Sequence, residues 1–247
     1  MRSARAFDPE GEKAFTIIPS RAQIPADPKP ANYVVIDVAH FSTTVLELLH
    51  NGAEYVHVSD QRGDEFAFKD EHPDARIGGG SSDVYTPTEG YDFFNSPSYV
   101  QDVDVEGRPT ACTSSNGGAA ITDLRNAGSN EIDVYVGAMA NARALADHLE
   151  GTDQETVLVA AGSRGKPSPE DTVGAIMIRR YLEDNPPTDS ELDLYREIVK
   201  AGKIVKYRQK AEIRCRDLLE YDMAVNTRSL VPKLEGQRLV DVGPGGV

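Results

Sequence analysis

The sequence predicts an α/β fold with three layers, α/β/α, around a mainly parallel or mixed sheet. From residue 109 onward, short apolar runs alternate with longer amphipathic segments. Three apolar runs, near residues 33, 109 and 156, lead into turns rich in Gly, Ser, Thr and Asn and then into helical patterns. Because open parallel sheets gather such turns at one edge, we expect the three turns to form a single site. Two halves that open alike leave an old internal duplication as an open hypothesis.

The first half of the chain contains the less regular pattern. We expect residues 1–13 to be frayed, 15–18 to form a strand and the proline-rich segment 25–30 to connect it onward. This divides the chain into an N-terminal strand and connector, 1–32, and one α/β domain, 33–247. The elements expected next are strands at 33–38 and 55–59, helices at 43–51 and 64–71, and an aperiodic Gly-, Ser- and Pro-rich loop at 78–98.

The second half alternates regularly between strands and helices. We expect strands at 109–113, 132–137 and 156–161, and helices at 119–127, 141–150 and 170–183. Asp189 or Ser190 can cap a helix that runs toward Lys200. A second helix, rich in Arg and Lys, is expected at 205–221, and a last strand at 238–242.

Composition excludes several classes of function. A formal charge of -14 and a pI near 4.8 argue against nucleic acid as a partner. No apolar run approaches the roughly 20 residues that span a membrane, and the first residues do not resemble a signal peptide, so we expect a cytoplasmic protein. The two cysteines form no metal-binding pair. A homo-oligomer is left open.

The acidic surface is also poor in lysine, with nine Lys against seventeen Arg. At very high salt, repulsion between carboxylates is screened, and Asp and Glu keep a protein hydrated. We therefore favour a halophilic source, with an ordinary acidic cytosolic protein as the alternative.

Asp37 is the strongest single candidate for a functional residue. It ends the apolar run 33–36, and a charge at that place needs a partner such as Mg²⁺, Arg or Lys. Glu170 and Asp171 open a helical pattern, where carboxylates also simply stabilise the helix dipole. A phosphate-binding loop of the Walker type is excluded, because Ala160 and Pro167 stand where that motif needs Gly and Ser or Thr.

Five segments taken together resemble the 2-phosphosulfolactate phosphatase (ComB-like) family over roughly residues 33–235. They are the segments 37–44 (DVAHFSTT), 90–97 (GYDFFNSP), 113–117 (TSSNG), 136–142 (VGAMANA) and 161–171 (AGSRGKPSPED). The resemblance implies an Mg²⁺-dependent phosphatase that acts on a small anionic phosphoester in coenzyme M synthesis. It also implies the site: catalytic residues Asp37, Thr43, Asn95, Ser96, Ser115, Asn116 and Arg164; substrate-binding residues His40, Thr44, Ser114, Gly117 and Gly162; metal ligands Asp37, Glu170 and Asp171.

The chain also departs from the family pattern, as a divergent member of haloarchaeal type would. The first motif of the family resembles Asp-x-x-Arg-Ala-Thr-Thr, and here His40 and Phe41 replace its Arg and Ala. A Gly-Glu pair is replaced near Gly80 and Ser81, and Phe94 stands in place of a Gly. Because Arg clamps an anion bidentately and His offers one donor, these changes affect substrate or rate. A catalytically silent metabolite-binding or interaction protein of the same fold is therefore the alternative.

The nucleophile is also undecided at this stage. Several hydroxyl side chains are candidates, and none has a neighbouring base in sequence. These are Ser42, Thr43, Ser96, Ser114 and Ser115.

Overall fold

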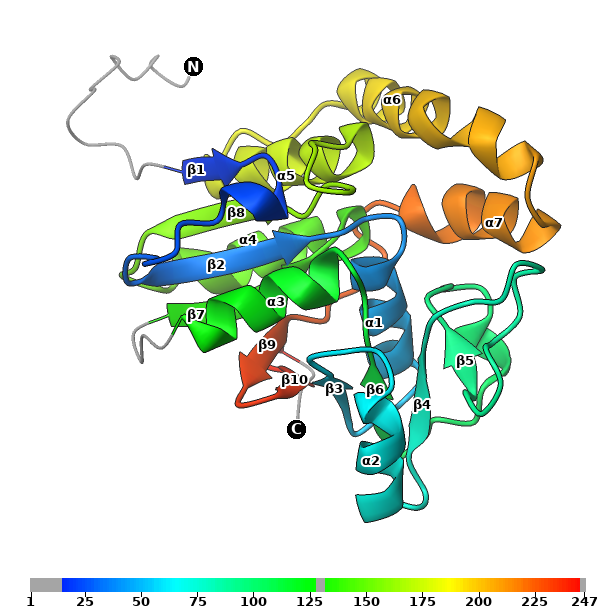
Figure 1. Cartoon of the computed structure of the whole chain (residues 1–247). Helices are drawn as coiled ribbons and strands as arrows, with labels where there is room; N and C mark the ends of the chain where they lie inside the picture. The colour runs from blue at the N-terminus through cyan, green and yellow to red at the C-terminus, as the bar shows by residue number, and fades with distance from the viewer. Residues whose placement is uncertain (1–14, 128–131, 245–247) are drawn as a thin grey trace, which may run out of the picture.

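The fold is built on one ten-stranded mixed sheet with helices on both faces, shown by the computed structural model in Figure 1. The structure describes residues 15–127 and 132–244. The strand order is β1-β8-β2-β7-β9-β10-β3-β6-β4-β5. The strands are β1 (Phe15–Ile18), β2 (Ala31–Ile36), β3 (Tyr55–Val58), β4 (Arg76–Gly79), β5 (Phe93–Phe94), β6 (Pro109–Cys112), β7 (Ile132–Gly137), β8 (Thr156–Ala160), β9 (Pro232–Glu235) and β10 (Arg238–Asp241). The predicted α/β fold with a mainly parallel sheet is confirmed.

The sheet consists of two parallel halves joined by an antiparallel hairpin. Strands β1, β8, β2 and β7 pair in parallel, and so do β3, β6, β4 and β5. Between them, β9 and β10 pair antiparallel with each other and with the flanking strands β7 and β3. Three antiparallel pairings in series reverse the strand sense from one half to the other. The two halves are also turned relative to each other, because in Figure 1 β2 runs horizontally whereas β4 runs vertically.

Seven α-helices are present among the described residues, together with short 3-10 turns and one π-helical turn. The helices are α1 (Phe41–His50), α2 (Asp64–Glu71), α3 (Gly117–Asn126), α4 (Ala142–Glu150), α5 (Pro169–Leu182), α6 (Asp189–Arg208) and α7 (Glu212–Arg216). The π-helical turn, η4, covers Asp217–Asp222.

Residue alternation along β2 explains why both of its faces are covered. Tyr33 and Val35 pack into a core shared with α1 and α3, whereas Val34 and Ile36 pack into a core shared with α4 and α5. Every residue of β2 is buried, as expected for a central parallel strand. Asp37, the residue directly after this strand, therefore also lies inside the protein.

Most predicted elements are confirmed within a few residues, but three expectations are wrong. The helix that runs past Lys200 is capped by Thr188 and not by Asp189 or Ser190, which lie inside its first turn. The predicted basic helix 205–221 does not exist as one element, because α6 continues to Arg208 and a break precedes α7 and η4. The predicted loop 78–98 contains the end of β4 and the short strand β5. The frayed segment 1–13 lies outside the described residues, and β1 pairs with β8 in the main sheet. None of the described helices is long and apolar enough to cross a membrane.

Candidate active site

Asp37 lies directly after β2, and its carboxylate reaches the turn that follows β6. Its Oδ2 accepts hydrogen bonds from the Gly117 amide at 2.8 Å and from Ser114 Oγ at 3.3 Å. Position 117 must be glycine for this approach, because a Cβ there would lie 2.7 Å from Asp37 Cβ and 2.6 Å from the Phe41 ring. The expected convergence of the turns after β2 and β6 is thus confirmed.

Burial governs the electrostatics of Asp37, which is 4% exposed. Desolvation raises the pKa of Asp37, opposed by the Gly117 amide and by the charge of Lys203. The charge of Glu170 adds to the increase in the pKa of Asp37.

The threonines after Asp37 hold the turn into α1. Thr43 Oγ1 donates to the Val38 carbonyl at 2.8 Å, and Thr44 Oγ1 donates to the His40 carbonyl at 2.8 Å. Both side chains are buried. Their hydroxyl protons are therefore used within the turn, which gives Thr43 and Thr44 a structural task at the positions where the sequence predicted catalysis and substrate binding.

Asp171, in the first turn of α5, binds two neighbouring loops. Its Oδ1 accepts from the Val38 amide at 2.8 Å, and its Oδ2 accepts from the Gly162 amide at 2.9 Å and from Ser168 Oγ at 2.7 Å. Burial, followed by the charges of Asp37 and Glu170, raises the pKa of Asp171. With both oxygens engaged, Asp171 fixes the loops after β2 and β8 against each other.

Glu170, the neighbour of Asp171, has a different environment. Its Oε1 lies 2.5 Å from Lys203 Nζ, which α6 contributes from above the site. Its Oε2 is buried without a hydrogen-bond partner among the described residues. Glu170 therefore keeps one oxygen available for a ligand.

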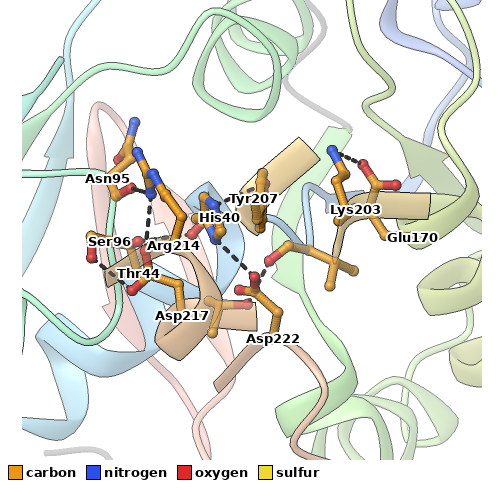
Figure 2. Close-up of polar contacts among 12 residues, drawn as sticks. His40, Thr44, Asn95, Ser96, Glu170, Lys203, Tyr207, Arg214, Asp217 and Asp222 are labelled. Atoms are coloured by element: carbon orange, nitrogen blue, oxygen red, sulfur yellow. Dashed lines mark hydrogen bonds and ion pairs between the residues drawn. The ribbon is translucent and has the colours of Figure 1, made fainter. Parts of the chain in front are cut away.

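His40 lies between α6 and η4, as Figure 2 shows. Its Nδ1 is 2.8 Å from Asp222 Oδ2, and its Nε2 is 3.0 Å from the Tyr207 hydroxyl. The His40 and Tyr207 rings stack with centroids 5.4 Å apart. Nε2 is hydrogen-bonded to Tyr207 and Nδ1 lies at ion-pair distance from Asp222, so both ring nitrogens of His40 face protein groups at the position where the sequence predicted a substrate contact.

The Asn95-Ser96-Pro97 turn is hydrogen-bonded to side chains of α7 and η4. Ser96 Oγ donates to Asp217 Oδ1 at 2.7 Å, and Arg214 Nη1 lies 3.0 Å from Asp217 Oδ2. Arg214 Nη1 also donates to the Asn95 carbonyl at 2.7 Å, while Asn95 Nδ2 donates to the Thr113 carbonyl at 2.9 Å. Figure 2 shows this second group beside the first. Asn95 Oδ1 is buried without a hydrogen-bond partner among the described residues.

A cavity of about 500 Å³ opens beside the turns after β6 and β8. Ser115, Asn116 and Arg164, three of the predicted catalytic residues, line it together. Arg21, bonded to Asp123 on α3, lines the opposite side and was not predicted. A larger cavity of about 720 Å³ lies between α4 and residues 226–229 and contains none of the predicted site residues.

Sequence reasoning missed the residues that α6, α7 and η4 bring to the site. They are Lys203, Tyr207, Arg214, Asp217 and Asp222. The only signal for them was the excess of Lys and Arg after residue 200, which does not indicate which side chains turn inward.

A comparison with known proteins identifies the family. The model of the 2-phosphosulpholactate phosphatase family matches residues 18–234. The chain belongs to the 2-phosphosulpholactate phosphatase family. The membership expected from the five segments is thereby confirmed, and the match covers every helix and all strands of both halves of the sheet except most of β1.

Individual members of the 2-phosphosulpholactate phosphatase family show the same relationship. A protein of Symbiobacterium thermophilum is 33% identical over 165 residues, which are 65% of this chain and 68% of that protein. One of Caldanaerobacter subterraneus subsp. tengcongensis is 29% identical over 228 residues, 85% of this chain and 90% of that protein. A protein of Deinococcus radiodurans is 31% identical over 160 residues, 64% of this chain and 65% of that protein. Each is named a probable 2-phosphosulfolactate phosphatase.

Proposed function

We propose that the chain hydrolyses a small acidic phosphoester of the 2-phosphosulfolactate type, releasing inorganic phosphate and an alcohol. The observation that carries this proposal is a pairing of opposite charges in the candidate site. The buried carboxylate of Glu170 pairs with Lys203, whose charge also lowers the pKa of the buried Asp37, and Arg164 lines a neighbouring cavity. Family membership supplies the reaction class, and the proposed role in coenzyme M synthesis rests on the family resemblance alone.

The cations of the site provide the attraction for a phosphate group. Desolvation lowers the pKa of Lys206, and the charges of Lys210, Lys203 and Arg164 lower it further. These groups therefore repel one another across the gap between α6 and the loop after β8. A phosphate dianion bound among them would relieve that repulsion, and the exposed Arg164 is placed to bind it bidentately.

Part of the predicted metal site fits Mg²⁺. Among the described residues, no cluster of three or more His, Cys, Asp or Glu side chains is arranged to hold a metal. Mg²⁺, however, commonly takes one or two carboxylates and keeps several waters, and the orphaned Glu170 Oε2 near Asp37 suits that pattern. We propose Asp37 and Glu170 as its ligands and assign Asp171 to loop positioning. When bound, the ion would neutralise phosphoryl oxygens and lower the pKa of a bound water.

The decisive experiment measures phosphate release by the purified protein from a panel of phosphoesters that includes 2-phosphosulfolactate. It is run with Mg²⁺ or with EDTA, in dilute and in molar KCl. Asp37→Asn keeps the shape of the side chain but loses its charge, so we expect kcat to fall by about 10³-fold or more. Asp60→Asn is the matched control, because Asp60 is exposed and pairs with Arg125 away from the site.

Each result has a distinct meaning. Turnover that survives Asp37→Asn would show that the site is misplaced, and turnover unaffected by EDTA would remove Mg²⁺ from the proposal. Absence of phosphate release from every ester would instead favour the metabolite-binding alternative.

A further inference from the structure

A chain of three buried side chains connects the end of β2 with the helices above the site. Asp222, His40 and Tyr207 are 1%, 8% and 4% exposed, and they contact one another in that order. Apart from the contact with His40, neither carboxylate oxygen of Asp222 has a hydrogen-bond partner among the described residues. Burying a carboxyl group with a single partner costs free energy, which indicates that Asp222 has a specific role at this position.

The π-helical turn η4 is the local distortion that brings Asp222 inward. In an α-helix, residues five apart point about 140° away from each other. Hydrogen bonds from i to i+5 instead bring such residues to the same side, and both ends of η4, Asp217 and Asp222, are buried. Asp217 then holds the turn at Ser96, and Asp222 holds His40.

The chain fixes α6 one turn away from the lysine that faces the carboxylates. Lys203 and Tyr207 are four residues apart on α6 and therefore share a face of the helix. Lys203 Nζ contacts Glu170, and Tyr207 contacts His40. Figure 2 shows Tyr207 next to His40 and Lys203 paired with Glu170. Anchoring Tyr207 thus restrains the position of Lys203.

We propose that Asp222, His40 and Tyr207 are positioning residues, which hold α6 so that Lys203 is presented to the phosphate group of the substrate. His40 then acts through α6 and does not bind the substrate. This inference rests on the proposed function, because it assigns Lys203 to phosphate binding. It also explains how the chain uses a histidine at position 40, where the family pattern has arginine.

A double-mutant cycle tests the coupling. Tyr207→Phe removes one hydroxyl and keeps the ring that stacks on His40, so the fold should survive. We expect it to raise KM about 5- to 10-fold with kcat changed less than about twofold, as loss of one hydrogen bond that orders a binding group would do. Lys203→Gln, whose amide can still donate to Glu170, should raise KM further. In the Lys203→Gln background, Tyr207→Phe should have less than about a twofold effect.

Tyr195→Phe is the matched control, since Tyr195 is a half-buried tyrosine on the same helix, about two turns before Lys203 and outside the chain of Asp222, His40 and Tyr207. It should leave KM unchanged. Hydrogen exchange of the purified variants gives an independent readout: Tyr207→Phe should speed exchange in residues 203–208, and Tyr195→Phe should not. An unchanged KM in Tyr207→Phe, or full additivity with Lys203→Gln, would overturn the proposal.

Titration with inorganic phosphate separates this inference from the proposed function. If wild type releases no phosphate from any ester, the hydrolysis proposal fails by itself. Weaker phosphate binding by Tyr207→Phe, with no further loss in the double variant, would still support the positioning role. Equal phosphate affinity of wild type and Tyr207→Phe would overturn it, and so would a wild type that binds no phosphate.

Discussion

The site has two sides, and different kinds of polar contact hold each of them together. On the strand side, which comprises the loops after β2, β6 and β8, carboxylates accept from main-chain amides: Gly117 to Asp37, and Val38 and Gly162 to Asp171. On the helix side, which comprises α6, α7 and η4, contacts between side chains predominate, as in Arg214 with Asp217 and His40 with Asp222. Two main-chain contacts add to them, from Arg214 to the Asn95 carbonyl and from the Ser98 amide to Asp217.

This difference indicates where the family can diverge. A main-chain amide is present whatever side chain its residue carries, so the strand side tolerates substitution at its donors. A side-chain pair needs both partners, so a change on the helix side requires a second change. Position 40, where this chain departs from the family pattern, contacts the helix side through Tyr207 and Asp222. We therefore expect differences in substrate within the family to follow the helix side.

The largest expected effect on stability is at Asp171 on the strand side, in comparison with Asp222 on the helix side. Asp171→Asn would present an amide group to at least one of three donors, so we expect the free energy of unfolding to fall by about 3 kcal/mol. Asp222→Asn can donate to His40 Nδ1 in place of the acid and should cost about 1 kcal/mol or less. Urea unfolding followed by circular dichroism measures both values. Equal losses would remove the distinction between the two sides.

A second prediction concerns the pH dependence of the helix side. Burial raises the pKa of Asp222 well above 3.8, with the charge of Asp217 adding to it. Burial, with Arg214, Lys203 and Lys210, lowers the pKa of His40 well below 6.5. Between pH 3.8 and 6.5 the titrating proton sits on His40 in the unfolded chain, and these shifts move it to Asp222 in the folded pair. We therefore expect the stability contributed by this pair to change little in that range.

We predict that the folded pair keeps this proton on Asp222 above pH 6.5, where the unfolded chain loses its histidine proton, so stability should fall as the pH rises. The loss approaches about 1.4 kcal/mol per pH unit until the folded pair releases its proton. Asp222→Asn has no such shared proton, and its contribution should be flat above pH 6.5. Unfolding curves of both proteins from pH 6.5 to 8.5 make the comparison. Parallel pH profiles would refute the shared proton.

The smallest expected effect lies at the outer end of α6. Thr188 caps this helix by accepting from the Glu191 amide, and Glu191 in turn accepts from the Thr188 amide. Thr188→Ala should cost about 1 kcal/mol of stability. Because the cap is four turns from Lys203, KM should stay within about twofold of the wild-type value. A large rise in KM would mean that the whole helix, and not the contact at Tyr207, positions the lysine.

The strand side of the site could be predicted from the sequence because its signals are local. An apolar run followed by small polar residues and a helical pattern places Asp37, Ser115 and Asn116 at strand ends, whatever the strand order. The sequence could not give that order. The turns after β2 and β6 belong to two parallel half-sheets. The hairpin at residues 232–241 joins these half-sheets and reverses the strand sense between them.

The helix side could not be predicted because its contacts join distant parts of the chain. His40 meets Tyr207 across 167 positions, and Ser96 meets Asp217 across 121. The π-helical turn has no local signature in residues 217–222, and the short strands β5 and β9 lack an alternating pattern. The assignments of Glu170 to a metal and of Ser96, Asn95 and Arg164 to catalysis stay predictions.

The hairpin of β9 and β10 also has a consequence for biosynthesis. During translation, β2, β7 and β8 of one half and β3, β6 and β4 of the other all leave the ribosome before residue 232 is added. Neither half can pair with the other until the hairpin inserts between β7 and β3, so both carry an unpaired inner edge until late in synthesis. A nascent chain stalled before residue 232 should therefore hold two half-sheets that are not yet joined by strand pairing.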